Sequence, residues 1–173
     1  MGMFVSTAAF RRKPDMDWAA LSEKLEQLFT EAGDVCHDLG EERTGYGTMS
    51  VYGGMGAEMA ETAKAISLAT GDFAVAADCV DSDFAVLTLY HGGNLVEQCV
   101  IGSPYDEFDD VMPLGKPDVE LWKPLLLDPE KVSELQDALL GNAVFVEEQL
   151  AALSRLTGVP VFDEALLEQD EWE

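Results

Sequence analysis

Apolar positions recur three and four residues apart in several segments of the chain, which is the spacing of one face of an α-helix. The clearest stripe comprises Trp18, Leu21, Leu25, Leu28 and Ala32. The same spacing predicts helices over residues 55–70, 128–141 and 145–157, with Asp128-Pro129 at the start of the second of these three. Residues 119–127 predict a helical turn around Trp122, which we expect in the core. In the last helix Val146, Leu150, Leu153 and Thr157 share the apolar face. Glu147 and Glu148 are therefore expected on its exposed side or near its start.

Apolar, partly β-branched runs without helical spacing occupy residues 73–80, 84–90 and 95–101. The breaks between them, Asp81-Ser82-Asp83 and His91-Gly92-Gly93-Asn94, are too short for a parallel crossover, so the three strands form an antiparallel meander over residues 73–101. Residues 3–10 predict an N-terminal strand and residues 46–52 a weaker one, whereas residues 34–45 indicate a loop.

These elements predict an α+β fold, in which an antiparallel sheet carries about four helices packed on one face. No linker-like stretch divides the chain, so residues 1–173 are expected to form a single domain. Residues 163–173 form an acidic tail that we expect to be partly mobile.

Three cysteines, an odd number, do not make a fully paired disulfide framework and favour a reducing compartment. No apolar run approaches the ~20 residues of a membrane span, and the basic residues near the N-terminus follow the apolar stretch instead of preceding it. We therefore expect a cytoplasmic protein that does not enter a membrane.

The most extreme property of the sequence is its net charge, which is −24. The first 13 residues carry three of the ten basic residues and no acid, so residues 14–173 hold 7 basic and 34 acidic residues, a net charge of −27. This balance excludes a nucleic-acid binder, which needs basic side chains to neutralise phosphates, and disfavours an anionic membrane surface. Two interpretations remain: the charge keeps the protein soluble, or it steers the protein toward a basic partner.

Asp78, Asp81 and Asp83 cluster near the first strand break and are the weak candidates for a metal site. An EF-hand loop starting at Asp81 would need a glycine and a glutamate where Val86 and Gly92 stand. Asp and Ser side chains that bond to local backbone amides are the simpler explanation. The sequence therefore predicts no metal.

Cysteine and histidine residues suggest no catalytic pair. Cys36 and His37 are adjacent and do not face each other, and Cys79 and Cys99 lie on predicted strands, where a free cysteine is usually a small buried hydrophobe. His91 is expected as a solvated residue of a hairpin turn. No phosphate-binding or nucleophile motif occurs, so no cofactor is predicted.

Two hypotheses follow. The first is a non-catalytic, acidic protein-binding domain that docks a basic protein, without binding nucleic acid or membrane. Its docking candidates are Tyr105, Asp106, Glu107, Asp109, Asp110 and Trp172. In size, charge and class the chain resembles bacterial antitoxin and immunity proteins, which implies an inhibitor or immunity-type protein. The alternative is a small enzyme or metal-binding protein that uses Asp78, Asp81 and Asp83, with His37 or His91.

Overall fold

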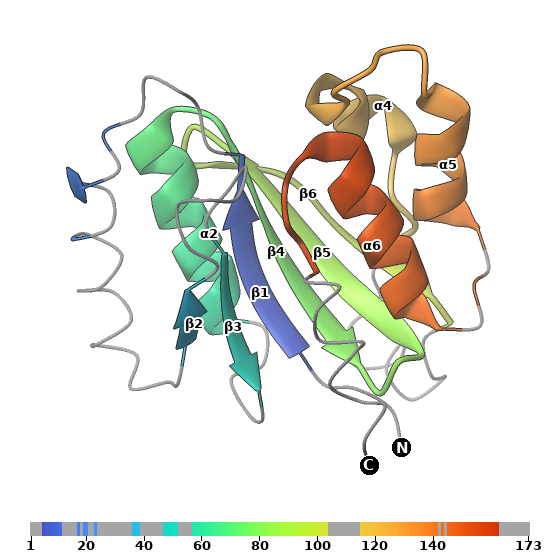
Figure 1. The fold of residues 1–173 in the computed structure, drawn as a ribbon, viewed down its shortest axis with the longest axis horizontal. Helices are drawn as coiled ribbons and strands as arrows, with labels where there is room; N and C mark the ends of the chain where they lie inside the picture. Colours follow the sequence, from blue (N-terminus) through green and yellow to red (C-terminus); the bar gives the residue numbers. More distant parts are fainter. Residues whose placement is uncertain are drawn as a thin grey trace.

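One antiparallel sheet organises the chain. The computed structural model describes residues 5–11, 17, 19–20, 23, 36–38, 47–51, 57–103, 115–141, 143 and 145–162. The strands are β1 (Val5–Phe10), β2 (Cys36–Asp38), β3 (Gly47–Val51), β4 (Phe73–Val80), β5 (Phe84–His91) and β6 (Asn94–Gly102). They lie in the order β2-β3-β1-β4-β5-β6, and every neighbouring pair is antiparallel (Figure 1).

The predicted meander is confirmed as β4, β5 and β6, which follow one another along the sheet. Gly92 and Gly93 turn the chain between β5 and β6 with φ values of 57° and 87°, the left-handed backbone that this tight hairpin needs. The N-terminal strand is also confirmed, and it lies inside the sheet between β3 and β4. The strand predicted at residues 46–52 is present as β3. β2 was missed, because three residues within a polar stretch carry no strand periodicity.

The helices are α2 (Ala57–Thr70), α4 (Val119–Trp122), the 3₁₀ turn η1 (Lys123–Leu125), α5 (Val132–Leu140) and α6 (Val146–Thr157). All four helical segments predicted after residue 54 are therefore present. α5 starts later than expected: Asp128 accepts a hydrogen bond from the Glu130 amide in the turn ahead of the helix, at 3.0 Å, and Lys131 is the N-cap. The prediction that Asp128-Pro129 caps this helix was therefore wrong by about one turn.

The helix predicted at residues 18–32 lies mostly outside the described residues. Ala19, Ala20 and Glu23 are helical, and the Ala20 amide donates to Asp17 Oδ1 at 3.1 Å, as an N-terminal capping aspartate would accept it. None of the helices within the described ranges is long and apolar enough to cross a bilayer.

The α+β class is confirmed, but the helices cover both faces of the sheet and not one. α4, α5 and α6 pack on the face that carries Val75, Ala77 and Cys79 of β4. α2 packs on the opposite face, where burial, followed by the charge of Glu61 of α2, raises the pKa of Tyr90. β4 is an almost unbroken apolar run buried on both sides, and such runs mark strands covered on both faces.

The larger core lies between the sheet and the layer of α4, α5 and α6. Trp122, expected in the core, is fully buried there together with Leu135, Leu139, Leu150 and Leu153. Arg11 joins the two layers at the end of β1, because its Nη1 donates to the carbonyl oxygens of Leu125 at 3.2 Å and Thr157 at 3.1 Å. The guanidinium therefore satisfies the last carbonyls of η1 and α6.

Candidate functional site

The turn between β4 and β5 has a strained backbone. Asp81 and Ser82 have φ values of 52° and 61°, a left-handed conformation that favours glycine. The Asp83 amide closes the turn on the Val80 carbonyl at 3.1 Å. Two successive non-glycine residues in this region persist only where their surroundings hold them.

Contacts with α6 and β6 hold this turn in place. The Ser82 carbonyl accepts from the Val146 amide at 3.0 Å, and the Ser82 hydroxyl donates to Glu147 Oε1. On the other side of the turn, the Ser103 amide donates to the Asp83 carbonyl at 2.9 Å. Ser82, Val146 and Glu147 are buried, so the two bonds of Ser82 to α6 form away from water. The backbone of the turn therefore satisfies the first amide of α6, and the Ser82 side chain binds the Glu147 carboxylate.

Glu147 lies in the first turn of α6, near the helix start as expected, but it is 3% exposed and therefore not on the exposed side. Its position in the first turn of the helix favours a carboxylate, because the amide dipoles point toward it. Oε1 is paired with Ser82, whereas Oε2 has no hydrogen-bond partner among the described residues. Glu148 is exposed, as expected.

Cys79 lies next to this carboxylate and is 2% exposed. Burial, followed by the charge of Glu147, raises its pKa from 9.0 to about 12. Burial and the neighbouring Glu97 likewise raise the pKa of the Cys99 thiol. Both thiols therefore stay protonated near neutral pH and are poor nucleophiles, and the expectation that they are buried is confirmed.

The structure separates the three aspartates of the alternative hypothesis. Asp78 is buried within β4, Asp81 is half-buried in the turn and Asp83 is exposed. Within the described part of the chain, no three histidine, cysteine, aspartate or glutamate side chains are grouped as metal ligands would be.

The two histidines lie far from this turn in the sheet. His91 is the last residue of β5, not a turn residue, and its exposed ring contacts Phe73, with ring centroids 4.4 Å apart. Cys36 and His37 are successive residues of β2, at the edge of the sheet opposite β6. The docking candidates Tyr105, Asp106, Glu107, Asp109, Asp110 and Trp172 lie outside the described residues.

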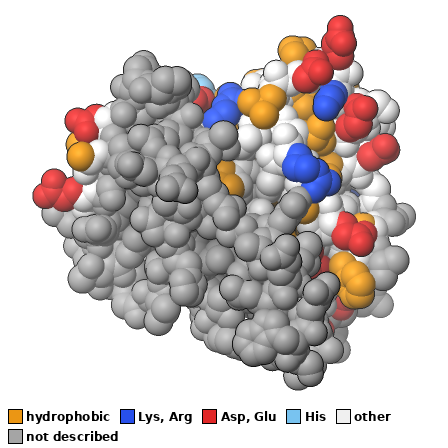
Figure 2. All heavy atoms as spheres, in the orientation of Figure 1, with side chains coloured by type: hydrophobic (Ala, Val, Ile, Leu, Met, Phe, Trp, Pro, Cys, Tyr) orange, Lys and Arg blue, Asp and Glu red, His pale blue; other side chains and the backbone are white. Residues whose placement is uncertain are grey.

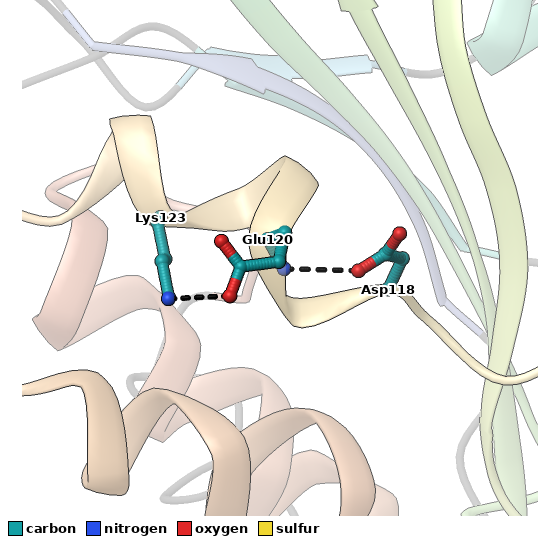
Figure 3. A network of polar contacts seen from close by, with 3 residues as sticks. All are labelled: Asp118, Glu120 and Lys123. Carbon is teal, nitrogen blue, oxygen red and sulfur yellow. Dashed lines mark hydrogen bonds and ion pairs between the residues drawn. The ribbon is translucent and has the colours of Figure 1, made fainter.

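Glu97 fixes α4 against the sheet. Its Oε1 accepts from the Asp118 amide and its Oε2 from Trp122 Nε1, each at 2.8 Å. On the outer side of α4, Asp118 caps the helix by accepting from the Glu120 amide at 3.1 Å, and Glu120 pairs with Lys123 at 2.5 Å (Figure 3). The carboxylates of Glu97, Asp118 and Glu120 therefore hold α4 in place through hydrogen bonds and an ion pair. The sequence carried no sign of the Glu97 contact, because it joins residues 25 apart.

Charges are unevenly distributed over α5 and α6. Glu134, Asp137 and Glu148 are exposed carboxylates on these helices. The basic residues are Lys131, which precedes α5, and Arg155, in the last turn of α6. Gln149 joins the helices, because its Nε2 donates to the carbonyl oxygens of Ala138 at 3.1 Å and Gly141 at 3.0 Å.

Comparisons of this chain with protein-family models, with curated proteins and with solved structures find no match.

Proposed function

We propose that the chain is a non-catalytic, acidic protein-binding domain that docks a basic protein, in the manner of an inhibitor or immunity-type protein. The observation that carries this proposal is the net charge of −24, which becomes −27 over residues 14–173. A surface field of one sign raises the rate of encounter with a partner of the opposite sign and suppresses encounters with like-charged proteins.

The described surface supports the proposal. Between residues 115 and 162, seven of the eight described carboxylates are exposed: Asp118, Glu120, Asp128, Glu130, Glu134, Asp137 and Glu148. Figure 2 shows acidic side chains around the outside of the helical layer. A carboxylate at the rim of an interface keeps part of its water, so its pairing with a basic group costs less desolvation than a buried ion pair and acts mainly on the association rate. The buried, protonated thiols of Cys79 and Cys99 add no reactive nucleophile. The alternative, a metal-binding protein or enzyme built on Asp78, Asp81 and Asp83, gains no support from their separate positions.

The salt dependence of association tests the proposal. Affinity capture from the native host identifies the partner, and stopped-flow mixing then measures the association rate from low to physiological ionic strength. We expect the rate to fall by about tenfold or more, because the screening length shortens to about 8 Å. The dissociation rate is measured in parallel and is expected to change less. An association rate that is independent of salt, or a captured partner that is acidic, would contradict the proposal.

A further inference from the structure

The closed end of the α5–α6 hairpin exposes two large apolar side chains. Leu140, the last residue of α5, is 40% exposed, and Phe145, directly before α6, is 54% exposed. α5 and α6 run in opposite directions, so the C-terminal end of α5 and the start of α6 lie together (Figure 1). Both side chains therefore sit at the same end of the helical layer.

Buried contacts hold this end of the hairpin in one conformation. The Gln149 side chain, 4% exposed, spans from α6 to the carbonyl oxygens of Ala138 and Gly141. The Gly141 amide donates to the Asp137 carbonyl at 2.9 Å and closes the last turn of α5. Val146 and Glu147 are fixed on the β4–β5 turn. Exposed apolar groups on a rigid support lose little conformational entropy on binding, so the surface is pre-organised for a partner.

Each of the two apolar residues has an exposed carboxylate three residues away in the sequence. Asp137 precedes Leu140 by one turn of α5, and Glu148 lies in the first turn of α6, which Phe145 directly precedes. The basic residues Lys131 and Arg155 belong to the opposite end of the hairpin. At the lower right of Figure 2, where α6 begins in Figure 1, apolar and acidic side chains lie next to each other.

We infer that the hairpin tip, defined as Asp137, Leu140, Phe145 and Glu148, is the surface that docks the partner, and that it receives a basic segment carrying a large apolar side chain. This inference rests on the proposed function and names its surface. The apolar side chain would pack on Leu140 and Phe145, while lysine or arginine groups pair with Asp137 and Glu148 at the rim. A second copy of the chain fits poorly, because a twofold contact would oppose the same carboxylates between two molecules of charge −24.

The test uses the full chain, labelled with ¹⁵N, and two synthetic probe peptides of equal charge. One is an amphipathic peptide of lysine and leucine, and the other replaces each leucine with serine. We expect the lysine–leucine peptide to shift the amide signals of residues 137–148 and to bind more tightly than the lysine–serine peptide. Binding of both peptides should weaken with salt.

Matched variants on the two faces locate the site. Phe145→Ala and Glu148→Gln alter the hairpin tip, whereas Leu68→Ala and Glu61→Gln make the same kinds of change on α2, where Leu68 is 67% exposed. We expect Phe145→Ala to lower the affinity for the lysine–leucine peptide about fivefold or more, and Glu148→Gln to lower it about twofold or more. The α2 variants should bind as the unaltered chain does. The amide spectrum of each variant reports whether its fold is intact.

The outcomes separate this inference from the proposed function. Two results would contradict the hairpin tip as the docking surface but not the proposal of a basic partner. In the first, salt-sensitive binding shifts the amide signals of residues outside 137–148. In the second, Leu68→Ala and Phe145→Ala weaken the binding equally. Equal affinity for the two peptides overturns the apolar part of the surface. If neither peptide binds at low salt, both the hairpin tip and the basic partner are wrong.

Discussion

Ser82 shows how a single residue carries a strained conformation. Its carbonyl accepts a hydrogen bond from the Val146 amide, and its hydroxyl donates one to Glu147. Its backbone also forms a hydrogen bond with the Cys79 thiol. A left-handed backbone costs an L-residue about 1–2 kcal/mol, and hydrogen bonds made away from water offset that cost. Glycine would relieve the strain at this position but would leave the Glu147 carboxylate without its hydroxyl donor.

Two substitutions separate these effects. Ser82→Ala keeps the strain and removes the hydroxyl, so we expect it to lower the free energy of unfolding by about 1–3 kcal/mol. Ser82→Gly removes the same hydroxyl but relaxes φ, so it should be about 1 kcal/mol more stable than Ser82→Ala. Urea unfolding measures both, and Ser133→Ala on the exposed side of α5 is the control, with an expected change below about 0.5 kcal/mol. Equal stabilities of the alanine and glycine variants would show that the turn stores no strain.

Sequence pattern predicts residue burial well where the residue is apolar and poorly where it is charged. Cys79, Cys99 and Trp122 were expected to be buried and are. Glu147 was expected on the exposed side of α6 or near its start, and it lies in the first turn of the helix but is buried. Its burial depends on a hydroxyl 65 residues away, and such a contact leaves no periodic signal.

At the scale of elements, local signals were sufficient for most boundaries. The meander followed from three apolar runs and two short turns, and α6 followed from one stripe that ends at Gly158 with φ of 70°. Local sequence pattern does not show on which face of the sheet each helix packs. α2 and α6 both carry apolar stripes, and only the continuous apolar character of β4 indicates that each face of the sheet needs a cover.

Substitutions in α6 test its packing. Leu153 is 1% exposed in the core between α6 and the sheet, so Leu153→Ala should lower the free energy of unfolding by about 2–5 kcal/mol through lost burial and the cavity left behind. Glu148→Gln, on the exposed side of the same helix, should change it by less than about 0.5 kcal/mol. Urea unfolding of the two variants measures both values. A neutral Leu153→Ala would mean that the apolar stripe of α6 is not packed as described.

At the scale of the whole molecule, the β6 edge of the sheet is protected against pairing with another chain. β6 is an outer strand of the sheet, and its Val100 amide donates to the Gly115 carbonyl at 3.0 Å, while Glu97 receives the Asp118 amide. A register shift opposite Leu89 and Tyr90 interrupts its ladder with β5. Bulges and a covering segment are common protections of an edge strand. These features, together with the net charge, disfavour the addition of a partner strand at the β6 edge.

Function was the property least accessible from sequence, because no motif carries it and charge belongs to the molecule as a whole. The net charge predicts a basic partner, and the docking candidates that the sequence offered for it lie outside the described residues: Tyr105, Asp106, Glu107, Asp109, Asp110 and Trp172. Leu140 and Phe145 belong to two helical segments with separate patterns, and only the antiparallel packing of α5 and α6 brings the ends of these segments together.

The same charge has a consequence for stability. With a net charge of −24, carboxylates repel one another in the folded chain more than in the expanded unfolded chain, and salt screens this repulsion. We therefore expect the Tm at pH 7 to rise by about 2–4 °C or more between about 0.01 M and 0.15 M sodium chloride, which corresponds to about 1 kcal/mol for a chain of this size. Thermal unfolding followed by circular dichroism measures the shift. Near pH 4, where about half of the carboxyl groups are protonated, the shift should shrink. A Tm at pH 7 that is insensitive to salt would show that local pairing already compensates the carboxylates, and it would remove the long-range field on which steering toward a basic partner depends.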